Sequence, residues 1–139
     1  MRLRILAYFL LVLSCNPKKV TIENAMEEYK NGNFELANKY CDLLLMVDSI
    51  NRTIYLIKSN SLIKSNKTPQ AFKTLSVAIS MNKKDAELYF ERARISEQMD
   101  NLDFAIIDYK MALQIDSSYF EACNNLANAL YLSHNFEEA

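Results

Sequence analysis

The stretch YFERARISEQMDNLDFAIIDYKMALQID, residues 89–116, decides the fold. In it, Ala105 is followed four residues later by Tyr109 and seven residues later by Ala112. Offsets of four and seven lie on one face of an α-helix. Twelve residues before Ala105 stands Ala93, a small side chain that lets two helices of a hairpin approach closely. The stretch therefore predicts a pair of packed helices.

The same pattern recurs along the chain at intervals of 34 residues. The alanine position is occupied by Ala37, Ala71, Ala105 and Ala139. The small position is occupied by Ala25, Ser59, Ala93 and Ala127. Further packing positions hold Cys41, Leu75 and Tyr109, and then Tyr55, Tyr89 and Cys123. A fixed period of this length predicts stacked helical hairpins, which provide binding surfaces rather than a catalytic pocket.

The residues between the two helices of each hairpin support this interpretation. Five residues before each alanine stand Gly32, Asn66, Asp100 and His134, residue types that tolerate the positive φ of a tight turn. The next position holds Asn33, Lys67, Asn101 and Asn135, and asparagine is a favoured N-cap. In the second repeat, Thr68-Pro69 predicts a helix that starts one residue later.

These residues resemble the tetratricopeptide repeat (TPR) family over about residues 18–139, most clearly at Tyr89–Asp116 and Asn125–Ala139. The resemblance implies an all-α, right-handed solenoid of about three and a half hairpins, with repeats at 18–51, 52–85, 86–119 and, incomplete, 120–139. The chain departs from the family at two positions. The closing proline is replaced by Ser49, Lys83 and Ser117, and the leucine before the small position by Asn24, Lys58 and Arg92. We expect helices at 20–31, 34–47, 52–65, 68–82, 86–99, 102–115 and 120–133, with an eighth beginning near Phe136.

In this family the first helix of each hairpin lines a concave groove that binds an extended peptide or a helix. The matching positions that we predict to bind a protein partner are Leu56, Asn60, Ile63, Lys64, Phe90, Arg94, Glu97, Asn128 and Tyr131. Apolar anchors among charges suit such a ligand. For Leu56 and Phe90, packing against neighbouring helices is an equally good interpretation. Some family members grip a carboxylate terminus with basic residues, but Glu87 and Glu91 occupy the places in the third repeat that would hold them.

The N-terminus forms a separate unit. Arg2 and Arg4 precede the apolar run Ile5–Leu13, which is too short to span a bilayer but suits a signal-peptide core. Leu13-Ser14-Cys15 resembles the lipobox of bacterial lipoproteins, in which the signal is cut before a cysteine that then carries the lipid. This resemblance implies a signal peptide at 1–14, lipidation at Cys15 and an anchor linker at 15–19. The alternative is an ordinary signal peptide with an incidental cysteine.

Composition and motifs exclude several classes of function. The net charge of the chain is −1, and removal of Arg2 and Arg4 with the signal would lower it by two, so nothing indicates nucleic-acid binding. Gly32 is the only glycine, which excludes a glycine-rich phosphate loop. His134 is the only histidine and is interpreted as a turn residue, and Cys41 and Cys123 are interpreted as packing residues. We therefore predict no catalytic residues, no metal and no cofactor.

Together these features predict a lipid-anchored scaffold of the bacterial cell envelope, at the outer membrane and facing the periplasm or cell surface. Because the sequence stops at the start of a second helix without a polar cap, we expect a truncated array. The alternative function is the N-terminal sensor or adaptor region of a longer protein with an enzymatic or signalling domain. Glycan capture is a third possibility, against which the absence of tryptophan weighs lightly.

The anchor prediction is tested by Cys15→Ala. The variant should be released from membranes or remain unprocessed, because the lipid has no other attachment point in the motif. Membrane fractionation and the mass of the processed chain measure this. A variant that is processed and membrane-bound like the wild type would contradict the lipobox interpretation.

Overall fold

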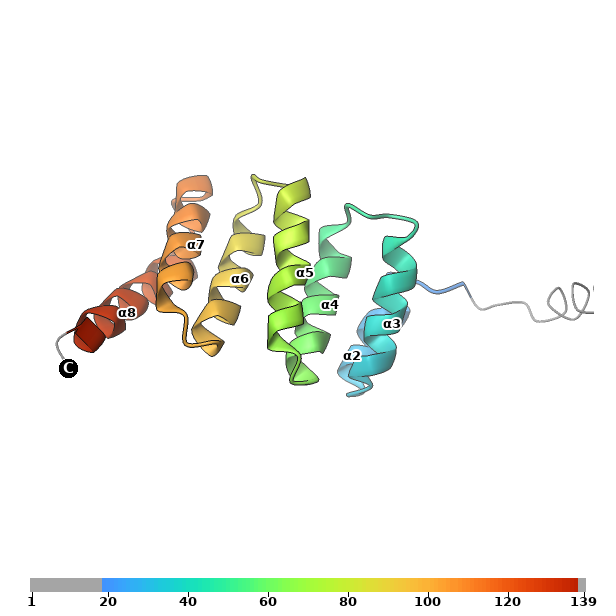
Figure 1. Ribbon diagram of the computed structural model, residues 1–139. Coiled ribbons are helices and arrows are strands. Elements are labelled where there is room, and N and C mark those ends of the chain that lie inside the picture. Colours follow the sequence, from blue (N-terminus) through green and yellow to red (C-terminus); the bar gives the residue numbers. More distant parts are fainter. Residues whose placement is uncertain (1–18, 138–139) are drawn as a thin grey trace, which may run out of the picture.

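Over residues 19–137, which are the residues that the computed structural model describes, the chain folds into seven α-helices. They are α2 (Ile22–Lys30), α3 (Phe34–Leu45), α4 (Arg52–Lys64), α5 (Thr68–Met81), α6 (Ala86–Gln98), α7 (Leu102–Ile115) and α8 (Phe120–Glu137). Each helix packs against the next one, and α2 also contacts α4, so the hairpins stand in a row (Figure 1). Among the described helices, none combines the length and the apolar character that a membrane crossing requires.

The predicted helices all form, and six of the seven begin and end within two residues of the predicted bounds. The seventh was predicted wrongly at its end. α8 continues through His134 to Glu137, so neither the turn at His134 nor the helix start near Phe136 is present. α8 contains neither glycine nor proline, so neither of the strongest helix-breaking residues interrupts it at His134. The predicted signal peptide, Cys15 and Ala139 lie outside the described residues.

Three turns inside the hairpins share one geometry. Gly32, Asn66 and Asp100 have φ of 81°, 57° and 56°, as predicted for this position. The next residue in each case, Asn33, Lys67 or Asn101, donates its N–H to the carbonyl five residues earlier, at Glu28, Leu62 or Ser96. This is the Schellman pattern that satisfies free carbonyls at a helix end.

Of the two asparagine N-caps predicted after these turns, Asn33 and Asn101, only Asn101 is confirmed. The Asn101 side chain accepts a hydrogen bond from the N–H of Phe104. Asn33 instead donates its side-chain amide to Glu28. α5 begins at Thr68 with Lys67 as its cap, so the predicted late start is wrong. Proline at the second position tolerates this start, because that N–H needs no partner within the helix.

Small side chains sit at the contact between the two helices of each hairpin. The residues of the alanine and small positions in the first three repeats are all buried: Ala25, Ala37, Ser59, Ala71, Ala93 and Ala105. Around them, Cys41, Leu75 and Tyr109 are fully buried, as their spacing predicts. The largest cluster of buried residues runs from α4 to α8, and a smaller one joins α2, α3 and α4. The core is therefore continuous along the array.

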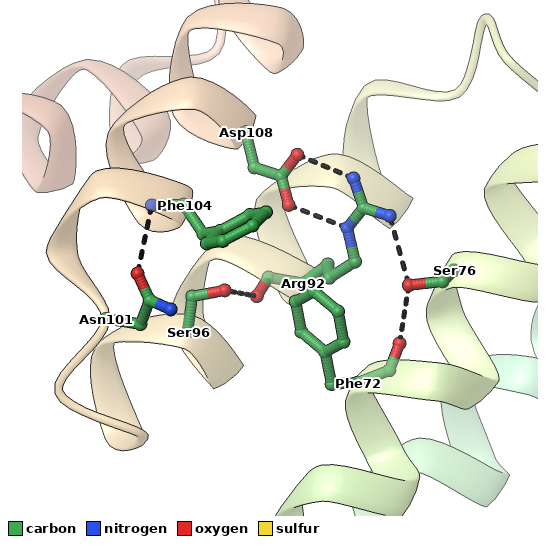
Figure 2. A network of polar contacts seen from close by, with 7 residues as sticks. All are labelled: Phe72, Ser76, Arg92, Ser96, Asn101, Phe104 and Asp108. Carbon is green, nitrogen blue, oxygen red and sulfur yellow. Dashed lines mark hydrogen bonds and ion pairs between the residues drawn. The ribbon is translucent and has the colours of Figure 1, made fainter.

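A buried ion pair joins three helices in the middle of the array. Arg92 on α6 donates two hydrogen bonds to the carboxylate of Asp108 on α7, at 2.7 and 2.8 Å (Figure 2). Its third nitrogen donates to the hydroxyl of Ser76 on α5, at 3.1 Å. The guanidinium also lies over the rings of Phe72 and Tyr89. Arg92, a departure from the family pattern in the sequence, is therefore a structural residue.

The same helix position forms a second ion pair in the preceding repeat. Lys58, 34 residues before Arg92, pairs with Asp42 on α3. Asp42 in turn stands 34 residues before Ser76, the third partner of Arg92. In both repeats the polar residue at this position thus reaches the second helix of the preceding hairpin.

We predict that Arg92→Met destabilises the fold by about 3–5 kcal/mol, because it leaves the buried Asp108 carboxylate without its partner. The double variant Arg92→Met/Asp108→Leu should recover much of this loss. Arg94→Met removes an arginine from the exposed side of the same helix and should cost about 0–1 kcal/mol. Urea unfolding measures all three. Equal costs for the two single variants would contradict the structural role of Arg92.

The two cysteines of the described chain are in different environments, and one prediction about them is wrong. Cys41 is buried, as expected, but Cys123 is exposed. In the preceding repeats the equivalent Tyr55 and Tyr89 lie in the core, and the Tyr55 hydroxyl reaches Met81 at the end of the second helix of its hairpin. Burial also raises the pKa of the Cys41 thiol to about 12, so its reactive thiolate is scarce.

We therefore expect a maleimide reagent at mildly alkaline pH to label Cys123 in the native protein and to leave Cys41 unlabelled until urea unfolds the chain. Peptide mapping by mass spectrometry locates the label. Cys123→Ser is the control, since it should abolish native labelling within residues 19–137. Native labelling of Cys41 as fast as that of Cys123 would show that the first hairpin is not packed as described.

Candidate peptide-binding groove

Two of the hollows in the described chain lie along the first helices of the hairpins, α2, α4, α6 and α8. We call the surface that holds these two hollows the groove face. The central hollow has a volume of about 340 Å³. Its lining comes from α2, α4 and α6: Tyr29, Asn60, Ile63, Lys64, Glu91, Arg94, Ile95 and Gln98. Three successive repeats therefore contribute to one surface, as an extended ligand requires.

The C-terminal hollow lies where the α6–α7 turn faces α8. It has a volume of about 930 Å³. Its lining residues are Glu97, Asp100, Asn101, Leu102, Asp103, Asn128, Leu132 and Ser133. Two apolar side chains thus stand among three carboxylates, and no basic side chain is among these lining residues.

The structure brings most of the predicted partner-binding residues to these hollows. Asn60, Ile63, Lys64 and Arg94 line the central hollow, and Glu97 and Asn128 line the C-terminal one. Leu56, Phe90 and Tyr131 line neither of them. Tyr131 is 67% exposed on α8.

Leu56 and Phe90 follow the packing interpretation instead. Leu56 is half-buried against the larger core cluster. Phe90 is buried, and its ring packs against Tyr109 at 5.8 Å and Tyr119 at 4.8 Å between centroids. Sequence spacing does not separate these residues from groove residues, because both lie on the first helix of a repeat.

Charges divide the groove face into two halves. In the central hollow, Arg94 pairs with Glu91 at 3.1 Å and stacks over the ring of Phe90, which leaves the exposed Lys64 as the uncompensated charge of the lining. In the C-terminal hollow the carboxylates of Glu97, Asp100 and Asp103 give the opposite sign. A bound peptide would therefore meet a basic region and an acidic region in sequence.

Glu97 also has a partner inside the protein. The hydroxyl of the buried Tyr109 donates to its carboxylate at 2.7 Å and accepts from the Asn125 amide at 3.3 Å. Burial, followed by the bond to Glu97, raises the pKa of Tyr109, so the phenol stays protonated as the donor. Glu97 thus joins α6 to α7 as well as lining the hollow. Tyr109 was predicted only as a packing residue, and spacing alone does not reveal this bond.

The two glutamates that argue against a carboxylate clamp form ion pairs with arginines. Glu87 pairs with Arg52 on α4 at 3.2 Å, and Glu91 pairs with Arg94. Near them, burial and the glutamates Glu87, Glu121 and Glu91 raise the pKa of Tyr119 to about 12. Two carboxylates paired with arginines thus occupy the places where a clamp requires basic residues.

A metal site is not formed in residues 19–137, where no group of three histidine, cysteine, aspartate or glutamate side chains is close enough to hold an ion. His134 lies on α8 and not in a turn.

Comparison with solved structures identifies the architecture. The first TPR domain of Spaghetti (RPAP3) bound to the HSP90 peptide SRMEEVD matches with a TM-score of 0.74 at 20% identity, covering 81% of this chain and 89% of that one. The Yersinia enterocolitica type III secretion chaperone SycD, in complex with a peptide of the translocator YopD, matches at 0.73 and 17%, covering 85% and 92%. A crystal structure of MamA matches at 0.77 and 19%, covering 91% and 75%.

No protein-family model matches the sequence, and no curated protein matches it either. The fold is nevertheless clear from the structures, because the hairpin arrangement agrees over most of both chains. The chain is an all-α solenoid with the fold of tetratricopeptide repeat domains.

Proposed function

We propose that the chain is a lipid-anchored scaffold of the bacterial cell envelope, which binds protein partners through an extended segment laid along the groove face. The observation that carries the binding proposal is the central hollow, because side chains from three successive repeats line it. The similar folds of RPAP3 and SycD are seen with peptides bound, which supports the same use here. The proposed role is that of an adaptor and not of an enzyme.

The anchor and the location rest on the N-terminal sequence. The basic start, the apolar run and Cys15 together support export and lipidation. In this proposal the array is held at the outer membrane and faces the periplasm or the cell surface.

The charges of the groove face narrow the chemistry of the ligand. An acidic side chain fits beside Lys64, and a lysine or arginine fits near the carboxylates of the C-terminal hollow. Apolar side chains between them would contact Ile63 and Leu132. We therefore propose a peptide segment that carries charges of both signs, separated by apolar residues.

The test is a selection of phage-displayed random peptides on the purified full chain, followed by affinity measurements on synthetic peptides. Selected peptides should combine apolar residues with separated acidic and basic residues. Lys64→Glu should raise their Kd about tenfold, or about 1.4 kcal/mol, and added salt should reduce this difference.

Lys73→Glu is the matched control, because Lys73 is an exposed lysine on α5 and lines neither hollow. It makes the same change of charge and should leave Kd unchanged. An equal loss of affinity in both variants would mean that only net charge matters. Selected peptides that bind both variants like the wild type would place the binding surface elsewhere.

A further inference from the structure

A second surface of the array is formed by the loops between successive hairpins, and we call it the inter-repeat edge. Figure 1 shows the α3–α4 and α5–α6 loops along the upper edge, and the turns within hairpins along the lower one. The α3–α4 loop is strongly apolar and exposed. Met46, Val47 and Ile50 have exposed fractions of 83%, 89% and 73%. Three exposed apolar side chains within five residues form a patch, and such patches mark sites that interact with a protein or a membrane.

The rest of the edge adds a large aromatic side chain and basic charge. Phe120, which begins α8 just after the α7–α8 loop, is 80% exposed. Lys83 and Lys84 are exposed in the α5–α6 loop. The loops also carry three carboxylates that accept hydrogen bonds: Asp48 from Asn51, Asp85 from Arg52 and Asn82, and Asp116 from Ser118. Of these three, only Asp85 is paired with a cation. The exposed apolar and aromatic side chains of the edge suit the interfacial region of a lipid bilayer.

The start of the described chain lies at the same end of the helices. α2 and α3 are antiparallel, so α2 begins where α3 ends. Ile22, the first residue of α2, belongs to the same hydrophobic cluster as Leu44, Leu45 and Ile54, which flank the α3–α4 loop. From Cys15 to Lys19 the chain has four peptide steps and spans at most about 13 Å. A lipid on Cys15 would therefore hold the inter-repeat edge near the bilayer surface.

We propose that the inter-repeat edge is a membrane-docking surface, whose residues Met46, Val47 and Ile50 enter the interfacial region of the lipid bilayer. The proposal rests on the lipid anchor of the proposed function. The anchor alone fixes one point of the protein and leaves its tilt free. The edge supplies a second contact, which orients the array. The groove face lies along the sides of the helices and not at their ends, so docking of the edge would leave it open to a partner.

The test uses the absence of tryptophan from the chain. Val47→Trp places a single tryptophan on the edge of the full-length protein. Phe104→Trp is the control, because Phe104 is half-exposed at the start of α7, at the opposite end of the helices. Both purified variants are mixed with vesicles of phosphatidylethanolamine and phosphatidylglycerol, with and without bromine on the acyl chains. Brominated lipid should quench most of the fluorescence of Val47→Trp and little of that of Phe104→Trp.

The outcomes separate the edge from the anchor. Equal quenching of both variants, or quenching of neither, would overturn the docking surface. A blue shift of Val47→Trp that needs no vesicles and grows with protein concentration would overturn it in favour of contact between copies. Cosedimentation of the wild type and Cys15→Ala with vesicles reports the anchor independently. If Cys15→Ala sediments like the wild type while Val47→Trp is still selectively quenched, the anchor fails and the docking surface stands.

Discussion

The close approach of the two helices in each hairpin is the constraint on which the structure depends. At this contact every described repeat with two helices places one pair of buried small residues, such as Ala93 and Ala105. Because interiors are close-packed, a larger side chain there would push the helices apart and shift the next hairpin with them. The stacking that follows brings the first helices onto one surface. The groove face is thus a consequence of residues that no ligand touches.

Arg92 stands where the repeat pattern has a leucine, and its polar contacts keep the hairpins stacked in place of an apolar contact. A leucine would fill the space between hairpins by burial alone, whereas Arg92 needs Asp108 and Ser76 in fixed places. The pair adds directionality, because two parallel hydrogen bonds to a carboxylate tolerate little rotation. Arg94, two residues further along the same helix, lies in the central hollow. The buried network and the groove are therefore linked through the orientation of α6.

Periodicity predicts what recurs and fails where the surroundings change. The positive φ of Asn66 follows from its place in a repeated turn, and the burial of Cys41 follows from its helix face. The same logic misplaces Cys123, which is exposed, and His134, which lies within α8 and not in a turn, because the burial and the turn of each position depend on the second helix of its hairpin. The partner of Arg92 was also missed. Ion pairs between helices depend on which two polar residues meet, and no single repeat contains that information.

Of the side chains predicted to bind a partner, those that line the hollows leave their helices toward solvent. Lys64 and Arg94 line the central hollow, whereas Phe90 at a neighbouring position turns into the core, because burying an aromatic ring against Tyr109 and Tyr119 outweighs its exposure to a ligand. The groove face that remains is mainly polar and charged. Charges on such a surface contribute more to specificity and direction than to affinity. In the proposed function, a basic half followed by an acidic half would therefore favour one direction of the peptide over the reverse, which a uniformly apolar groove would not do.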